Sequence, residues 1–169
     1  SGNDLIDKVD GNRSYLSEGI QARLDWNFMT GDADHYMQLG IRVHEDDADR
    51  FQRRGFFAQE NGQLVVVDAG VWGDAGNRID SAEANSYYLT DTITWGNWTL
   101  TPGVRYEDVE LKREDWSSAP DRSAAASVRT NSVSEVLPGF GAVWAINDTT
   151  SVLFGAHKGF APPGSSASD

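Results

Sequence analysis

The sequence has no cysteine among its 169 residues. Disulfide frameworks and thiolate metal sites are therefore excluded. Basic residues are also scarce, because 14 Lys and Arg stand against 26 Asp and Glu, for a net charge of −12. Nucleic-acid binding depends on clustered cations that displace condensed counterions, so a nucleic-acid partner is not expected.

Long apolar runs are missing as well. No window approaches the roughly 18 consecutive apolar residues that a membrane-spanning helix requires. A transmembrane β-barrel needs only every second residue to be apolar, so this composition remains compatible with a barrel. The first residues lack the basic start and apolar stretch of a signal peptide, and we expect the sequence to be an excerpt of a longer protein.

What the sequence does contain is regular alternation of apolar and polar residues. The alternation covers residues 19–29, 37–44, 98–107 and 135–144, and it is blurred over residues 84–95. A last strand is expected from about residue 150 to residue 160. A period of two is typical of a strand with one apolar and one polar side. The apolar run from Leu64 to Val67 predicts a further short strand within a long connection. The expected fold is all-β, with about six antiparallel main strands.

The connections between these strands alternate in length. Short turns are expected at residues 30–34, 96–97 and 147–148, and long polar stretches at residues 45–80 and 112–131. We expect the acidic runs at 45–49, 74–83 and 107–115 to lie in solvated loops. An up-and-down meander with short turns at one end and long loops at the other produces this rhythm, whereas a Greek-key sandwich gives no reason for it.

Aromatic residues gather near the expected short turns. In a membrane barrel they would form a girdle at the lipid–water interface. In a soluble sandwich the same residues would close one end of the core, and alternation alone does not separate the two. Strands of about a dozen residues favour the barrel, because roughly 9–11 residues suffice to cross the bilayer at a tilt. The candidate interface aromatics are Trp26, Phe28, Trp95, Trp98 and Trp144.

Five segments occur in a consistent order, at residues 9–19, 39–51, 98–107, 137–142 and 155–163. Together they resemble TonB-dependent outer-membrane receptors, in particular the ferric-citrate and siderophore receptor branch. The resemblance extends over nearly the whole chain, and phrases such as LTPGVRYE and KGFAPP are characteristic of barrel strands in that family.

The resemblance implies that residues 1–169 are part of a plugged barrel of the 22-stranded type, with about six of its strands. The plug domain, the TonB box and the remaining strands would lie outside this sequence. The implied function is import of ferric chelates or a similarly scarce nutrient across the bacterial outer membrane with energy supplied through TonB. The expected partners are outer-membrane lipid, a ferric chelate and, through the missing regions, TonB.

Catalytic and metal-binding patterns are not apparent. No nucleophile elbow accompanies the three histidines, and the acidic runs lack EF-hand spacing, so neither an enzyme nor a metal site nor a cofactor is expected. Cations on the polar face could bind an anionic iron complex, or they could pair with carboxylates such as Asp25 and Glu107. The alternative function is a soluble all-β binding or adhesion module. The candidate ligand-facing residues are Arg42, His44, Arg105, Glu107, His157 and Lys158.

Overall fold

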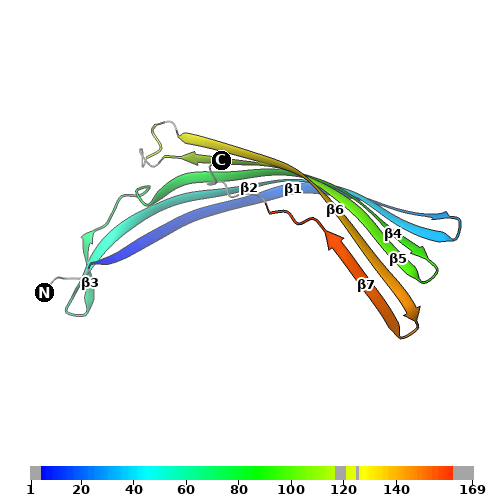
Figure 1. Cartoon of the computed structure of the whole chain (residues 1–169). Coiled ribbons are helices and arrows are strands. Elements are labelled where there is room, and N and C mark those ends of the chain that lie inside the picture. The colour runs from blue at the N-terminus through cyan, green and yellow to red at the C-terminus, as the bar shows by residue number, and fades with distance from the viewer. Residues whose placement is uncertain (1–4, 117–120, 125, 162–169) are drawn as a thin grey trace.

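The computed structural model describes residues 5–116, 121–124 and 126–161. Within these residues it contains a single long, curved sheet (Figure 1). No helix in the described part of the chain has the length and apolar character needed to cross a bilayer. The strands are β1 (Ile6–Thr30), β2 (Ala33–Glu60), β3 (Gln63–Asp68), β4 (Gly76–Trp95), β5 (Trp98–Asp115), β6 (Ser127–Asn147) and β7 (Thr150–His157).

The sheet is an antiparallel meander, as the alternation predicts. Its spatial order is β1-β2-β4-β5-β6-β7. The short strand β3 contains the run from Leu64 to Val67 and pairs with the end of β2. Because β1 occupies the other edge of β2, β3 and β4 follow one another along the same edge. The predicted barrel-wall arrangement is therefore confirmed, with β3 as an extra piece at the far end.

The short turns also agree with the sequence. The three hairpins β1–β2, β4–β5 and β6–β7 turn at the same end of the sheet (Figure 1). Gly31 and Gly96 have φ values of 62° and 54°, a left-handed conformation that glycine adopts without steric cost. The fourth tight turn, Asn61–Gly62, lies at the opposite end, and both of its residues have positive φ, as a type I′ hairpin requires.

The predicted long loops are largely wrong, because strand structure continues into the acidic stretches. Strand β2 extends through residues 45–60, β4 already begins at Gly76, β5 continues to Asp115, and β6 begins at Ser127. Charged residues can line both sides of a strand where neither side must meet lipid, and cross-strand ion pairs then support the ladder. Strand β7 ends at His157 rather than near Phe160. The predicted stop at residues 162–164 lies outside the described residues.

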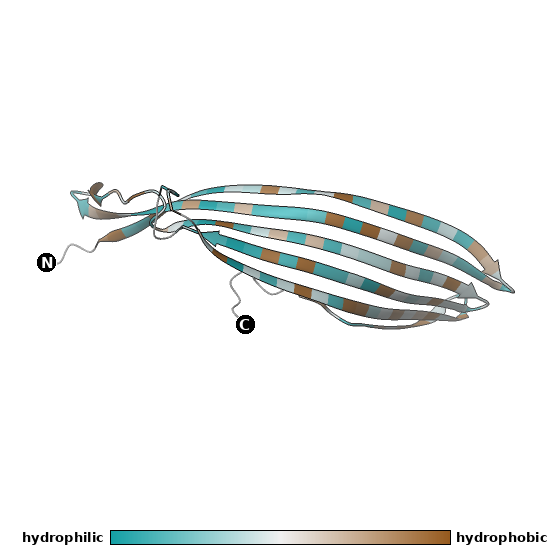
Figure 2. Cartoon of the chain, turned by 90° about the horizontal axis from the view of Figure 1, so that it is seen from above, coloured by the Kyte–Doolittle hydropathy of each residue, from teal (hydrophilic) through white to brown (hydrophobic). Residues whose placement is uncertain are grey.

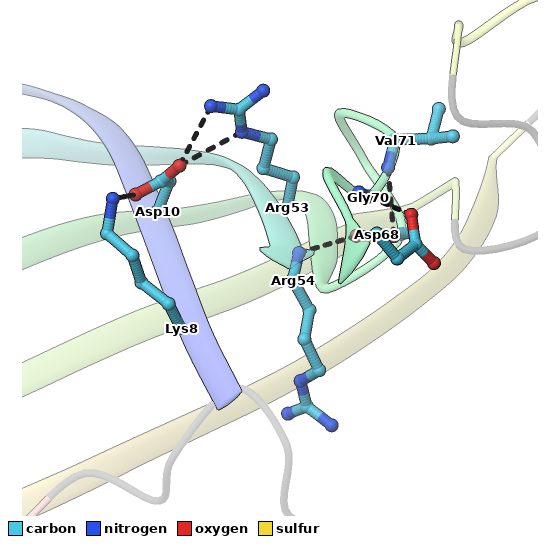
Figure 3. A network of polar contacts seen from close by, with 8 residues as sticks. Lys8, Asp10, Arg53, Arg54, Asp68, Gly70 and Val71 are labelled. Atoms are coloured by element: carbon cyan, nitrogen blue, oxygen red, sulfur yellow. Dashed lines mark hydrogen bonds and ion pairs between the residues drawn. The ribbon is translucent and has the colours of Figure 1, made fainter. Parts of the chain in front are cut away.

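Polar contacts stabilise the end of the sheet opposite the β1–β2, β4–β5 and β6–β7 turns. Asp10 on β1 accepts hydrogen bonds from Arg53 on β2 (Nε at 3.0 Å) and lies 2.8 Å from Lys8 Nζ (Figure 3). Hydrogen bonds from Lys8 and Arg53 hold the pKa of Asp10 below its usual value.

The β3–β4 connection follows the free edge of β2. Asp74 accepts hydrogen bonds from the backbone N–H groups of Arg54 (3.0 Å) and Val71 (3.1 Å). Gly70 has a φ of 66°, and a Cβ at this position would collide with the Arg54 carbonyl. The connection is thus held close to the sheet backbone at a position that requires glycine.

Candidate functional site: two faces of a barrel wall

Strand register gives the sheet two chemically distinct sides. Leu24 on β1 lies opposite Leu39 on β2, which lies opposite Leu89 on β4, and the same row continues through Val104 to Pro138. We call the side that carries this row the apolar side and the other the polar side. The leucines are 38–61% exposed, and no second layer of the described chain covers them. Hydropathy alternates along the strands accordingly (Figure 2).

All five candidate interface aromatics lie on the apolar side. Trp95, Trp98 and Trp144 form one row near the turns, in which Trp98 and Trp144 stack at 5.4 Å. Trp26 and Phe28 contact one another at 5.4 Å. Their role at a membrane interface stays a prediction.

A second aromatic row was missed from the sequence. Tyr87 and Tyr106 lie opposite one another with ring centroids 6.3 Å apart. Tyr87 and Trp95 both belong to β4, and their separation of eight positions corresponds to about 26 Å along the strand. This interval resembles the apolar band of roughly 25 Å, bounded by aromatic girdles, in outer-membrane barrels. The repeated spacing of aromatic residues on one side of the strands is the sequence signal that could have identified this second row.

Two of the predicted ligand-facing residues, Arg105 and Glu107, form a compact network with Ser86 on the polar side, and a third, Lys158, belongs to a separate ion pair. Glu107 accepts hydrogen bonds from the Arg105 guanidinium and from the Ser86 hydroxyl. Glu107 is 8% exposed and Ser86 is 2% exposed. Lys158 pairs with Glu135 on β6. Arg105 and Lys158 therefore have carboxylate partners. This corresponds to the second of the two alternatives from the sequence, in which the cations pair with neighbouring carboxylates.

Arg42 and His44 occupy a different environment on the same side. No carboxylate of the described chain lies within ion-pair distance of Arg42. His44 Nε2 lies 3.5 Å from Asp46, and its Nδ1 is buried without a hydrogen-bond partner in the described residues. His157 lies opposite Gly139 and is exposed. A role of these residues in ligand binding stays a prediction.

We call the stretch of the apolar side between the two aromatic rows the belt. Farther from the hairpin turns than this belt, the polar side carries a row of arginines that we call the basic row. Arg13 on β1 lies opposite Arg50 on β2, and Arg50 lies opposite Arg78 on β4. Neighbouring strands are about 4.8 Å apart, so the row spans about 10 Å. Arg78 Nε approaches Asp80 at 3.2 Å, and both Arg50 Nε and Arg78 Nε are buried without a hydrogen-bond partner among the described residues. Like charges directly opposite one another are destabilising, and an anion bound between them would relieve that cost.

The apolar side carries a row of negatively charged residues near the position of the basic row. Glu18, Glu45, Glu83 and Glu110 lie opposite one another across four strands. In the described part of the chain, no group of three or more His, Asp or Glu side chains is arranged to hold a metal ion. The charge difference between the two sides would repel an anionic ligand from the glutamates and attract it to the basic row.

One ionisable pair interrupts the apolar side within the belt. His35 Nδ1 lies 2.7 Å from Asp91 Oδ2, and Phe28 stacks on the imidazole at 4.6 Å. Asp91 lies midway between Tyr87 and Trp95 on β4.

Pro102 faces Asp91 in the register of β5 and cannot donate a ladder hydrogen bond, yet the register is the same before and after it, without a bulge.

The pair of His35 and Asp91 allows a stability prediction. Replacing His35 with leucine leaves an uncompensated carboxylate on the apolar side, and we expect a loss of about 2 kcal/mol in the free energy of unfolding. Replacing both residues with leucine removes the charge and is expected to restore stability to within about 1 kcal/mol of wild type. Equilibrium urea unfolding of the full-length protein in lipid vesicles measures both values. A double variant as unstable as the single one contradicts the assignment.

Comparisons with known proteins agree with this geometry. The family model described as TonB dependent receptor-like, beta-barrel matches residues 2–169. The ferric citrate transporter FecA in its unliganded form is 24% identical, with a TM-score of 0.72 over 90% of this chain. The siderophore receptor PiuA from Acinetobacter baumannii is 17% identical, with a TM-score of 0.59 over 83% of this chain. These identities show a shared fold, and the chain spans only 21% and 23% of the two structures.

Proposed function

Because the chain belongs to the TonB-dependent receptor β-barrel family, a family of outer-membrane receptors and transporters rather than enzymes, we propose that it forms part of the wall of a ferric-chelate importer. Residues 1–169 would supply neighbouring strands of one larger barrel. The plug, the remaining strands and the segment that contacts TonB would belong to other parts of the full-length protein. Energy coupling through TonB is therefore proposed for the whole receptor and not for this chain alone.

The two-sided wall supports this function over a soluble binding or adhesion module. A soluble sheet needs a second layer to bury its apolar side. Here the belt, which is the stretch of the apolar side between the two aromatic rows, is uncovered in the described chain. Lipid would cover such a belt in a barrel, with the polar side toward the lumen. Outer-membrane lipid is thus the proposed partner of the apolar side.

The basic row is the observation that carries the cargo proposal. Arg13, Arg50 and Arg78 would line the outer part of the lumen, above the membrane belt. Guanidinium groups bind carboxylates through paired, charge-assisted hydrogen bonds, and three in a row fit a ligand with several anionic oxygens. An anionic ferric chelate meets this requirement. FecA, which shares the fold, is a ferric citrate transporter, and PiuA is a siderophore receptor.

Growth under iron limitation tests the proposed function. A strain that lacks the full-length gene should grow poorly when an anionic ferric chelate is the only iron source. A plasmid copy should restore growth only in the presence of functional TonB. Normal growth of the deletion strain on every ferric chelate tested would contradict the proposal, provided that no second receptor for the same chelate is present.

A further inference from the structure

Residues 121–124, a described part of the β5–β6 connection that contains Arg122, are tied to the side of the sheet opposite the basic row. Arg122, in the described part of this connection, forms a two-pronged pair with Asp49 on β2, in which Nη2 lies 2.6 Å from Oδ1 and Nη1 lies 3.1 Å from Oδ2. Its Nε donates a hydrogen bond of 2.7 Å to Asn77 Oδ1 on β4. Since β4 and β2 precede β5 in the sheet order, Arg122 reaches across two strands.

Aromatic rings complete the contact. The Arg122 guanidinium lies 4.8 Å from the Trp116 ring centroid and 5.6 Å from that of Phe51. Phe51 in turn stacks on Trp72 of the β3–β4 connection at 5.8 Å. Cations over aromatic faces are attracted by the ring quadrupole, most strongly where water is partly excluded. Phe51 therefore brings Arg122 of one long connection and Trp72 of the other against the apolar side of β2, beyond the belt.

Burial and backbone conformation show that these contacts determine the position of Arg122. Asn77, the acceptor of its Nε hydrogen bond, is 2% exposed. Hydrogen bonding and charge from Asp49 raise the pKa of Arg122, so the guanidinium stays charged. The φ of Arg122 is 58°, a left-handed value that residues other than glycine rarely adopt and that persists only where surrounding contacts hold it.

We propose that the Asp49–Arg122 pair is a strap that holds residues 121–124, within the β5–β6 connection, against the apolar side of the wall. Asp49, Phe51 and Asn77 all lie on that side, whereas Arg50 and Arg78 lie on the other. With the strap closed, residues 121–124 are kept away from the basic row, and an anion that approaches along the polar side meets the arginines directly. The strap follows from contacts within the chain and does not depend on the identity of the cargo.

Limited trypsin digestion of the purified full-length receptor tests the strap. Trypsin must take an arginine side chain into its acidic specificity pocket, and a guanidinium engaged by Asp49 is not available to it. In Asp49→Ala we expect cleavage after Arg122 to be at least about tenfold faster than in wild type, because the unstrapped population rises. Mass spectrometry of the fragments identifies the cleavage site.

The matched control is Asp47→Ala, which removes a carboxylate on the same strand and side that makes no hydrogen bond or ion pair with Arg122 in the described residues. It should be cleaved at the wild-type rate. Asp49→Asn keeps the side-chain shape, and we expect accelerated cleavage there too, which covers the case of an alanine variant that fails to assemble. Equal cleavage of wild type and both Asp49 variants overturns the strap. The digestion needs no transport, so its result is independent of the proposed function.

Discussion

Replacing Arg50 with glutamate in the full-length receptor is expected to weaken binding of an anionic ferric chelate at least about a hundredfold. Arg50 is the middle member of the basic row, and its neighbours across the sheet are Arg13 and Arg78. Loss of a charge-assisted hydrogen bond costs about 1.5–3 kcal/mol, and a reversed charge adds repulsion. Since about 1.4 kcal/mol corresponds to a tenfold change in affinity, the lost hydrogen bond alone accounts for about ten- to a hundredfold, and the added repulsion brings the expected loss to about a hundredfold or more.

Quenching of intrinsic tryptophan fluorescence by the chelate, measured in detergent without TonB, gives the dissociation constant. The matched control is Lys112→Glu, an equal change of charge on β5. Lys112 lies on the apolar side of the sheet, opposite the side of the basic row, so the variant should bind the chelate within about twofold of wild type. Arg50→Lys keeps the charge but loses the planar fork, so an intermediate loss is expected. If Arg50→Glu binds as tightly as Lys112→Glu, the basic row is not part of the ligand site.

Arginine substitutions at two adjacent residues of β4 are expected to differ strongly in their effect on barrel assembly. Leu89 lies on the apolar side between the two aromatic rows, and an arginine there should destabilise the folded barrel in lipid by about 2–4 kcal/mol. Thr90, the next residue, lies on the polar side opposite Gly103, where an arginine would face the lumen. Thr90→Arg should therefore change stability by less than about 1 kcal/mol.

Equilibrium unfolding of the full-length receptor in lipid vesicles measures this difference, and the shift of the folded band on unheated gels reports assembly. The pair of variants separates a barrel from a soluble sandwich, because both substitutions add the same side chain to neighbouring positions. If Thr90→Arg were the more damaging of the two, the polar side would be the packed one. The proposed contact between the apolar side and lipid would then be wrong.

The sequence by itself determined the strands within the belt, the short turns and the side on which the apolar residues lie. These features are local, since side chains alternate every two residues and a tight turn needs only a few residues of suitable chemistry. Even the pairing of Arg13 with Arg50 can be derived, because both lie 18 positions from the β1–β2 turn at Gly31–Asp32. That derivation requires strand structure beyond residue 45, where the polar composition predicted a loop.

Only the tertiary structure decided the extent of the strands, the third member of the basic row and the strap at Arg122. The register of β4 on β2 follows an irregular connection, whose path depends on contacts such as Asp74 with Arg54. The Asp49–Arg122 pair joins residues 73 positions apart. Periodicity reports which side of its own strand a residue occupies, but hydrogen bonding between strands decides which residues of other strands lie beside it. The belt could therefore be predicted from the alternation, whereas the charged surfaces beyond it arise from the assembled sheet.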